Sequence, residues 1–279
     1  MKLRQILQTA VDDELISKNP CRSVPTPRPV RGERKALSLE EASRLRSCLL
    51  REPMGAQVAC VLLMLDCGMR KGEALGLTWE AFDEQAGTLS ITQQYTGDKR
   101  LRAPKSRSST RTVCLTRTAR DFLVRWRGVQ AAELGNLAIR QGGETPIVHS
   151  VSVSREGGAK LPAVNHMDDR NFSRWFRDFA VDHGFGTYRT ITKTFVRDGV
   201  AHVRGKDYVG LCPHALRHTQ ATLLISEGAD VKTVQSRLGH SSPDVTLSIY
   251  SHVVASKDRE AADEFESLLS KVGKSNSQQ

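Results

Sequence analysis

Residues 54–68, MGAQVACVLLMLDCG, are apolar around almost the whole circumference of a helix. A helix with no water-favouring face must be covered by other elements, so this segment predicts a buried central helix. Gly68 stands where a left-handed C-cap is least costly, and the helix is expected to end there. Arg70 then emerges at a helix junction, where Glu73, one turn further on, can orient its guanidinium.

The net charge of the chain favours a polyanionic partner. Its 279 residues are enough for a hydrophobic core without disulfide staples, and its formal net charge is +10. Each Lys or Arg placed against a phosphate releases condensed counterions, so nucleic acid is modestly favoured among polyanionic partners. Charge alone leaves ribosomal, membrane-surface and generic basic proteins open.

The cysteine pattern argues against zinc sites and disulfide frameworks. Six cysteines are scattered without a C-x-x-C pair, and we expect reduced, mostly buried thiols. The N-terminal segment lacks the apolar core of a signal peptide, and no stretch approaches the roughly 20 apolar residues of a membrane span. The sequence therefore predicts a cytoplasmic protein without a membrane partner.

The N-terminal region predicts a helix followed by a linker. Apolar residues at helical spacing predict an amphipathic helix in residues 1–18, running to about Ile16. Residues 19–36 contain four prolines and five basic residues, which predicts an extended linker. We expect the helix to have finished another domain, most of which this chain does not contain. Packing of the helix against the main domain is an equally open alternative.

The main domain is expected to span residues 37–272 and to begin with a helix, because Ser38 and Glu41 have capping-box spacing. Residues 88–116 change to short β-prone runs and predict a small antiparallel sheet. The loop between these runs concentrates positive charge against a single Asp98. We favour DNA contact over a merely solvated hairpin for its residues Lys99, Arg100, Arg102, Lys105 and Arg107.

Downstream segments predict scaffold elements and a second basic hairpin. Residues 118–134 read as a helix and residues 145–153 as strand-like, while the aromatic stripe in residues 172–179 is expected to be core. Residues 188–209 alternate about Asp198-Gly199, which predicts an inserted β-hairpin. We expect four of its residues to contact DNA: Lys193, Arg197, Arg204 and Lys206.

The run PHALRHTQATLL predicts a helix that carries phosphate-binding side chains. Pro213 suits its first turn, and His214 and Arg217 then lie three residues apart on one face. His218 falls in line with apolar residues of the same helix, so we interpret it as a buried core histidine.

The following run, LGHSSPDVTLSIYSH, presents His240 at a helix end and Tyr250 in a short helix. Two guanidinium groups can grip a phosphodiester, imidazoles can relay protons, and a phenol can attack phosphorus. Arg70, His214, Arg217, His240 and Tyr250 together predict a phosphate-handling site with a tyrosine nucleophile.

These motifs, with CGMRKGEALGLTW and PKSRSSTRTVCL, resemble the tyrosine recombinases of the phage integrase family. The resemblance extends from about Leu37 to Phe265 and implies an α+β fold, a mainly helical catalytic domain with a small antiparallel sheet. It implies site-specific DNA recombination or integration for a mobile element. One ester is exchanged for another of similar energy, so neither cofactor nor metal is implied.

The resemblance also implies a role for each site residue. Tyr250 attacks the scissile phosphodiester and forms a 3′-phosphotyrosyl link, while Arg70 and Arg217 stabilise the phosphorane. Lys105 protonates the departing 5′-oxygen, His214 accepts or relays the proton of the nucleophile, and His240 hydrogen-bonds a non-bridging oxygen.

Two departures and two alternatives accompany the resemblance. Members of the family usually carry a helical core-binding domain, and integrases often add an arm-binding module. Only the last helix and linker of the core-binding domain are expected here, in residues 1 to about 36, so we expect weak DNA binding by this chain. The family implies a homotetramer on DNA and a directionality factor. Residues 256–272 are expected to form a tail helix, which in the family commonly packs on a neighbouring protomer; docking on its own domain is the alternative. Residues 273–279 are expected to be disordered. A type IB topoisomerase-like activity and a non-catalytic DNA-binding remnant or regulator are the competing interpretations.

Overall fold

The computed structural model describes residues 2–24, 36–104, 109–156, 159–190, 194–197, 200–203 and 205–239. The chain divides into two compact units, residues 1–34 and 35–279. Each unit is described by itself.

The first unit contains helix α1 (Lys2–Asp12) and the 3-10 turn η1 (Pro20–Arg22). The predicted end near Ile16 was wrong, because Glu14 turns to a φ of 58° and the N–H groups of Leu15 and Ile16 both return to the carbonyl of Ala10. The predicted linker also begins with regular structure, since Pro20 opens η1. Its residues 25–35 lie outside the described residues.

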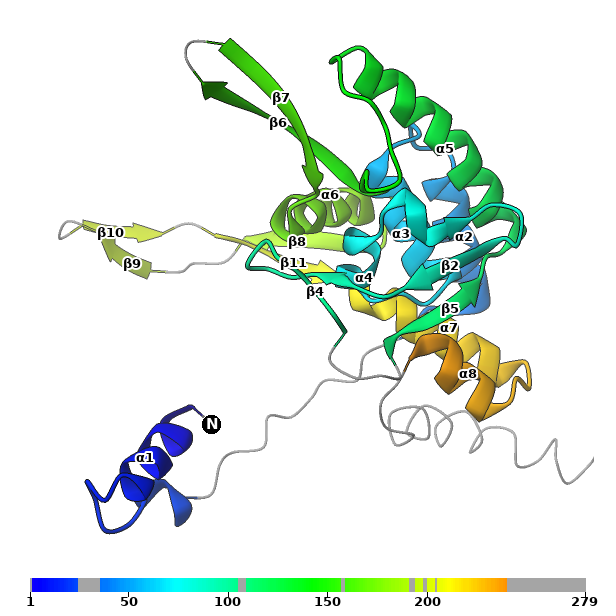
Figure 1. The fold of residues 1–279 in the computed structure, drawn as a ribbon. Coiled ribbons are helices and arrows are strands. Elements are labelled where there is room, and N and C mark those ends of the chain that lie inside the picture. Colours follow the sequence, from blue (N-terminus) through cyan, green and yellow to red (C-terminus); the bar gives the residue numbers. More distant parts are fainter. Residues whose placement is uncertain are drawn as a thin grey trace, which may run out of the picture. The chain divides into compact units, whose positions relative to one another are not determined.

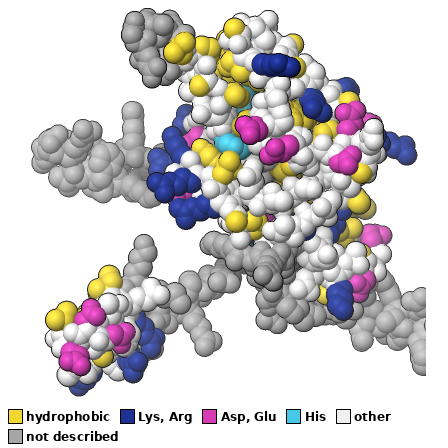
Figure 2. Space-filling model, in the orientation of Figure 1, with side chains coloured by type: hydrophobic (Ala, Val, Ile, Leu, Met, Phe, Trp, Pro, Cys, Tyr) yellow, Lys and Arg dark blue, Asp and Glu magenta, His cyan; other side chains and the backbone are white. Residues whose placement is uncertain are grey.

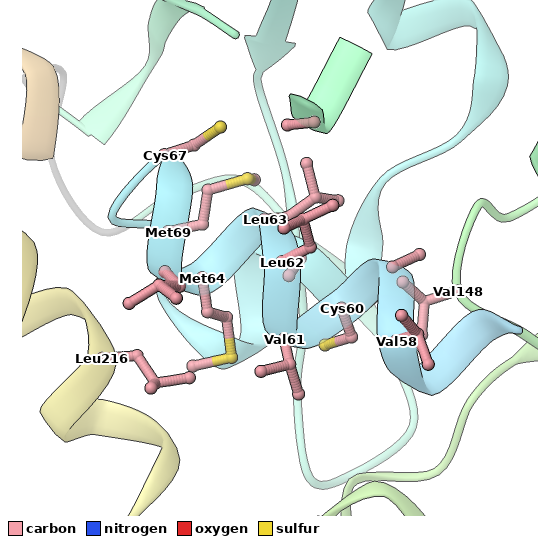
Figure 3. Packing of buried hydrophobic residues seen from close by; sticks show 14 of the residues in the cluster. Val58, Cys60, Val61, Leu62, Leu63, Met64, Cys67, Met69, Val148 and Leu216 are labelled. Carbon is pink, nitrogen blue, oxygen red and sulfur yellow. The ribbon is translucent and has the colours of Figure 1, made fainter. Parts of the chain in front are cut away.

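Helix α3 (Ala56–Asp66) is the centre of the second unit. Every residue in it except Gln57 is buried, which confirms the prediction of a central buried helix. It packs against α2 (Leu39–Leu49), α4 (Lys71–Gly76), α5 (Arg117–Gly135), α6 (Asp169–Asp182) and α7 (Pro213–Ser226). Figure 3 shows Val58 beside Val148 at one end of α3 and Met64 beside Leu216 of α7 at the other.

Both predicted caps around this core are present. The Ser38 hydroxyl accepts the N–H of Glu41 at 3.1 Å, and the Glu41 carboxylate accepts the N–H of Ser38 at 2.9 Å. Beyond the last turn of α3, Gly68 adopts a left-handed φ of 63°. The local sequence therefore fixes where α2 starts and where α3 stops.

A small antiparallel sheet lies beside the helices, as predicted. Strands β1 (Phe82–Asp83), β2 (Thr88–Ile91) and β5 (Arg111–Cys114) follow the turn η2 (Trp79–Ala81) and pair in the order β1-β2-β5. Between β2 and β5, strands β3 (Gln94–Tyr95) and β4 (Leu101–Arg102) form a separate hairpin, whose tip carries Lys99 and Arg100. The α+β class is confirmed (Figure 1).

The sequence analysis missed one long hairpin. Strands β6 (His149–Glu156) and β7 (Ala159–His166) pair along their whole length, whereas only the first part of β6 was predicted. Pro162 lies opposite Val153, and a proline is tolerated there because a strand of a two-stranded ribbon has a free edge.

The inserted ribbon has two paired parts. Strands β8 (Gly186–Thr190) and β11 (Lys206–Gly210) pair with each other, and β9 (Thr194–Arg197) pairs with β10 (Val200–Val203). Arg197 opposes Val200, and the predicted turn residues 198–199 lie outside the described residues.

Two expectations about side chains had different outcomes. Phe172, Phe176 and Phe179 are buried and Trp175, partly buried, packs against the same core, which confirms the aromatic stripe as core. All six cysteines are free, but only Cys60 and Cys67 are buried, so the expectation of mostly buried thiols was wrong. No helix in the described part of the chain is long and apolar enough to span a membrane.

Candidate active site

The C-terminal end of α3 is the foundation of the site. Its terminal carbonyls are capped from two other helices: Arg217 of α7 donates to the carbonyl of Gly68 at 2.8 Å, and Arg237 of α8 (Val231–Leu238) donates to that of Asp66 at 3.0 Å. Cations are favourable at this end of a helix dipole. A Cβ on Gly68 would lie 2.3 Å from Leu238, so α8 approaches closely only because this residue is glycine.

Arg70 leaves the same junction and begins α4. Its Nη1 donates to Oε1 of Glu73 at 2.7 Å, while Oε2 of Glu73 accepts the backbone N–H of Arg70 at 2.9 Å. This geometry confirms the predicted orienting contact. The Arg70 Nη2 also donates to the carbonyl of Gly239 at 3.0 Å. The side chain of Arg70 remains 33% exposed, so its head can still meet a ligand.

The structure adds an arginine that the sequence analysis had not singled out. Arg111, the first residue of β5, donates Nη2 to Oε2 of Glu73 at 2.9 Å and Nη1 to Oε1 at 3.2 Å. Glu73 is thus held from two sides by Arg70 and Arg111. Burial alone would raise the pKa of Glu73, but its hydrogen bonds and ion pairs with these arginines lower it below the ordinary value. The carboxylate is therefore ionised at neutral pH.

Arg217 is the most deeply buried cation of the group, with 3% of its residue surface exposed. Its Nη1 lies 4.0 Å from Oε2 of Glu73, and its Nη2 is buried without a hydrogen-bond partner among the residues that the structure describes. Burial, and after it repulsion from Arg70, lowers the pKa of Arg217 to about 9. An unpaired buried donor on a charged group is costly, and a bound anion would remove that cost.

These four side chains form what we call the arginine cluster: Arg70, Glu73, Arg111 and Arg217. Three guanidinium groups face one carboxylate, so the cluster keeps an excess of positive charge beside the partly exposed head of Arg70. Such a site can hold the non-bridging oxygens of a phosphodiester. The two predicted arginines, 147 positions apart in sequence, both reach Glu73.

The remaining predicted catalytic residues are placed only in part. His214 is exposed on the first turn of α7, and the interpretation of His218 as fully buried was wrong, because it is half-buried. Lys105, His240 and Tyr250 lie outside the described residues. Gly239 is described, however, so the residue that precedes His240 contacts Arg70.

The predicted DNA-contacting residues that are described lie on the surface. Lys99, Arg100, Arg102 and Lys206 are exposed, and Lys and Arg side chains gather at the edge of the second unit where the β3–β4 and β8–β11 hairpins lie (Figure 2). Arg102 pairs with Asp98, and Lys99 lies 3.5 Å from Asp168. Arg107, Lys193 and Arg204 lie outside the described residues, as does the side chain of Arg197.

Comparisons with known sequences support the interpretation of the motifs. A sequence model described as the phage integrase family matches residues 35–257. The chain is 26% identical over 270 residues to the ICEBs1 integrase of Bacillus subtilis (strain 168), covering 96% of this chain and 64% of that protein. It is 27% identical over 285 residues to a tyrosine recombinase XerC-like protein of Caldanaerobacter subterraneus subsp. tengcongensis, covering 96% of this chain. The chain spans 64% of the length of both relatives.

Solved structures share the fold. The Tn1549 transposon integrase in complex with a circular intermediate DNA superposes with a TM-score of 0.61 at 18% identity, covering 94% of this chain and 76% of that one. The XerA recombinase superposes with a TM-score of 0.52 at 21% identity, covering 87% of this chain and 66% of that one.

Proposed function

The chain belongs to the phage integrase family, and from this premise we propose that it breaks and rejoins DNA at specific sites through a covalent 3′-phosphotyrosyl intermediate. Its relatives include the integrase of ICEBs1, and a structural neighbour is a transposon integrase, which favours a role in moving a mobile element. The observation that carries the proposal is the buried Nη2 of Arg217, which has no partner in the described part of the chain and lies in the same cluster as the partly exposed Arg70.

In the proposed reaction, the phenolic oxygen of Tyr250 bonds to phosphorus as the bond from phosphorus to the 5′-oxygen breaks. His214 accepts or relays the phenol proton, and Lys105 delivers a proton to the departing 5′-oxygen. Attack by the 5′-hydroxyl of a partner duplex reverses these steps and restores the phenol. These three roles, and the contact of His240 with a non-bridging oxygen, follow from the motifs of the family.

The two arginines are proposed to stabilise the negative charge that gathers on the equatorial oxygens of the phosphorane. Arg217 is preorganised by its bond to Gly68, so little reorganisation accompanies charge development. Arg70 is oriented by Glu73 and approaches from the more exposed side. Double-stranded DNA is the proposed substrate, and assembly into a tetramer and control by a directionality factor are proposed with it.

A covalent selection from random target sequences tests the proposal. The chain is incubated with a library of nicked duplexes whose central sequences are random, and SDS-resistant adducts are recovered and sequenced. We expect a recurrent sequence motif with the wild type and no adduct with Tyr250→Phe. Equal recovery with both proteins, or none with either, contradicts the catalytic proposal and favours a DNA-binding remnant.

A second step separates recombination from topoisomerase action. Duplexes carrying the selected motif are offered in pairs, and strand-exchanged products are expected. Relaxation of a supercoiled plasmid that lacks the motif, without any exchanged product, would instead identify a type IB topoisomerase-like enzyme.

A further inference from the structure

Arg111 differs from the other two arginines of the cluster because all three nitrogens of its guanidinium group donate to Glu73 or to backbone carbonyls of the protein. Besides its two bonds to Glu73, its Nε donates to the carbonyl of Arg237 at 2.7 Å and its Nη1 to that of Ser109 at 3.1 Å. Its side chain is 6% exposed. Each nitrogen of Arg111 thus has a partner within the described part of the protein, whereas Nη2 of Arg217 is buried and has no hydrogen-bond partner there.

The position of Arg111 matters because Glu73 has more than one cation within reach. Nη1 of Arg217 lies 4.0 Å from Oε2 of Glu73, and that same oxygen accepts from Nη2 of Arg111 at 2.9 Å. Without Arg111, the carboxylate would be free to draw Arg217 onto itself. One positive charge would also be lost, which would halve the excess over the single carboxylate. Both changes oppose anion binding.

Arg111 also fixes the last turn of α8. It binds the carbonyl of Arg237, and Arg70 binds that of Gly239, so two cations cap the same helix end. Because His240 follows directly in sequence, this contact sets the point from which the segment toward Tyr250 departs.

We propose that Arg111 is a positioning residue, which neutralises Glu73 and anchors the end of α8 so that Arg70 and Arg217 stay available to a phosphate. The proposal rests on the function proposed above but concerns a residue that never touches the substrate. It predicts that removing Arg111 weakens phosphate binding mainly because the Glu73 carboxylate loses its partner.

The test is a double-mutant cycle between Arg111 and Glu73 read by anion binding, which needs no DNA cleavage. The guanidinium Nε–Hε signal of Arg217, assigned with Arg217→Lys, is followed by NMR during titration with inorganic phosphate at constant ionic strength. We expect Arg111→Met to weaken phosphate binding about tenfold. Adding Glu73→Gln to Arg111→Met should restore the affinity to within about threefold of wild type.

Controls separate this effect from a loss of fold or of general charge. Arg125→Met removes an exposed arginine from α5, whose Nε bonds only to its own helix, and should leave phosphate binding unchanged. Arg111→Lys keeps the positive charge but loses the planar, forked guanidinium group, so phosphate affinity should fall less than in Arg111→Met. If Arg111→Met does not fold, Arg111→Lys carries the comparison with and without Glu73→Gln.

The outcomes distinguish this inference from the function it rests on. A double variant that binds phosphate as weakly as Arg111→Met, or more weakly, would overturn the positioning role. Restored phosphate binding without covalent adducts from wild type would support that role and contradict the recombinase proposal. With the duplex recovered by the covalent selection, the rate of adduct formation should follow the same order as phosphate affinity.

Discussion

The arginine cluster and the β3–β4 hairpin are both basic, but the charged side chains are mostly buried in the first and exposed in the second. In the cluster, Arg111 and Arg217 are buried and held by a buried carboxylate and by backbone carbonyls. At the hairpin tip, Lys99 and Arg102 are exposed and meet the partly exposed Asp168 and Asp98. Buried charges keep one geometry and interact strongly, whereas exposed charges are screened by water and salt. The roles proposed for the two regions follow this difference: catalysis on one phosphate for the cluster, and general attraction to DNA for the hairpin.

The largest contrast is expected when the acidic partner is removed from each region. Glu73→Ala leaves buried guanidinium groups without their carboxylate and should lower the free energy of unfolding by about 3–5 kcal/mol. Asp98→Ala removes an exposed acid and should leave the denaturant midpoint nearly unchanged. Urea unfolding of both variants checks this, and equal destabilisation would remove the distinction between the regions.

A charge-conserving change should next separate catalysis from binding. Arg217→Lys keeps a positive charge but cannot bond Gly68 and a phosphate oxygen with a rigid fork, so adduct formation should slow by about 10²-fold or more. Affinity for the selected duplex should change little. The same substitution in the hairpin, Arg102→Lys, serves as the matched control. A comparable loss of rate there would contradict the assignment of catalysis to the cluster and of DNA attraction to the hairpin.

The hairpin itself is expected to act through salt-dependent affinity. Replacing Lys99, Arg100 and Arg102 by alanine should reduce the slope of log affinity against log salt by up to about 3, since each phosphate contact contributes about 0.9. The rate of adduct formation at saturating protein should stay within about twofold. An unchanged slope in filter binding at several salt concentrations would show that these side chains do not contact DNA.

The smallest expected effect lies at two histidines paired across β6 and β7, His149 and His166; the ring of His166 also stacks on that of Tyr95 in β3. Burial lowers the pKa of His149 and of His166 below 6.5, so the unfolded chain binds more protons than the folded one as the solution is acidified. Their contribution to stability is complete above pH 6.5 and is lost as the pH falls through the folded pKa values. Thermal unfolding from pH 7.5 to 5.5 measures the loss, and His166→Gln should reduce its pH dependence.

Local spacing explains why part of the site could be predicted. Arg70 and Glu73 are one helical turn apart, and Pro213 sets the phase of α7, so their placement follows from neighbouring residues. The family motifs then linked Arg70 with Arg217 across the chain. Arg111 was missed because its signal is not local: its carboxylate partner lies 38 positions away, and within its own run it reads as an ordinary strand residue.

Prediction of the fold has the same limit, because features that depend on residues distant in sequence were missed. The buried helix, its caps and the small sheet follow from apolar periodicity and turn residues. Strand β7 does not, because Pro162 argues against a strand and only pairing with β6 supplies its hydrogen bonds. Likewise, Gln130 joins Trp79 and His149 through buried hydrogen bonds that no sequence window contains.

Gly68 takes part in three structural features: the end of α3, the hydrogen bond of Arg217 and the close packing of α7 and α8. Its φ of 63° ends the central helix, its carbonyl receives Arg217, and a Cβ there would lie 2.2 Å from Gln220 as well as close to Leu238. Gly68→Ala would therefore disturb the end of α3, the hydrogen bond of Arg217 and the packing of α8 at the same time. In a screen for variants that still fold, substitutions should be accepted at many positions of the surrounding core before any is accepted at Gly68.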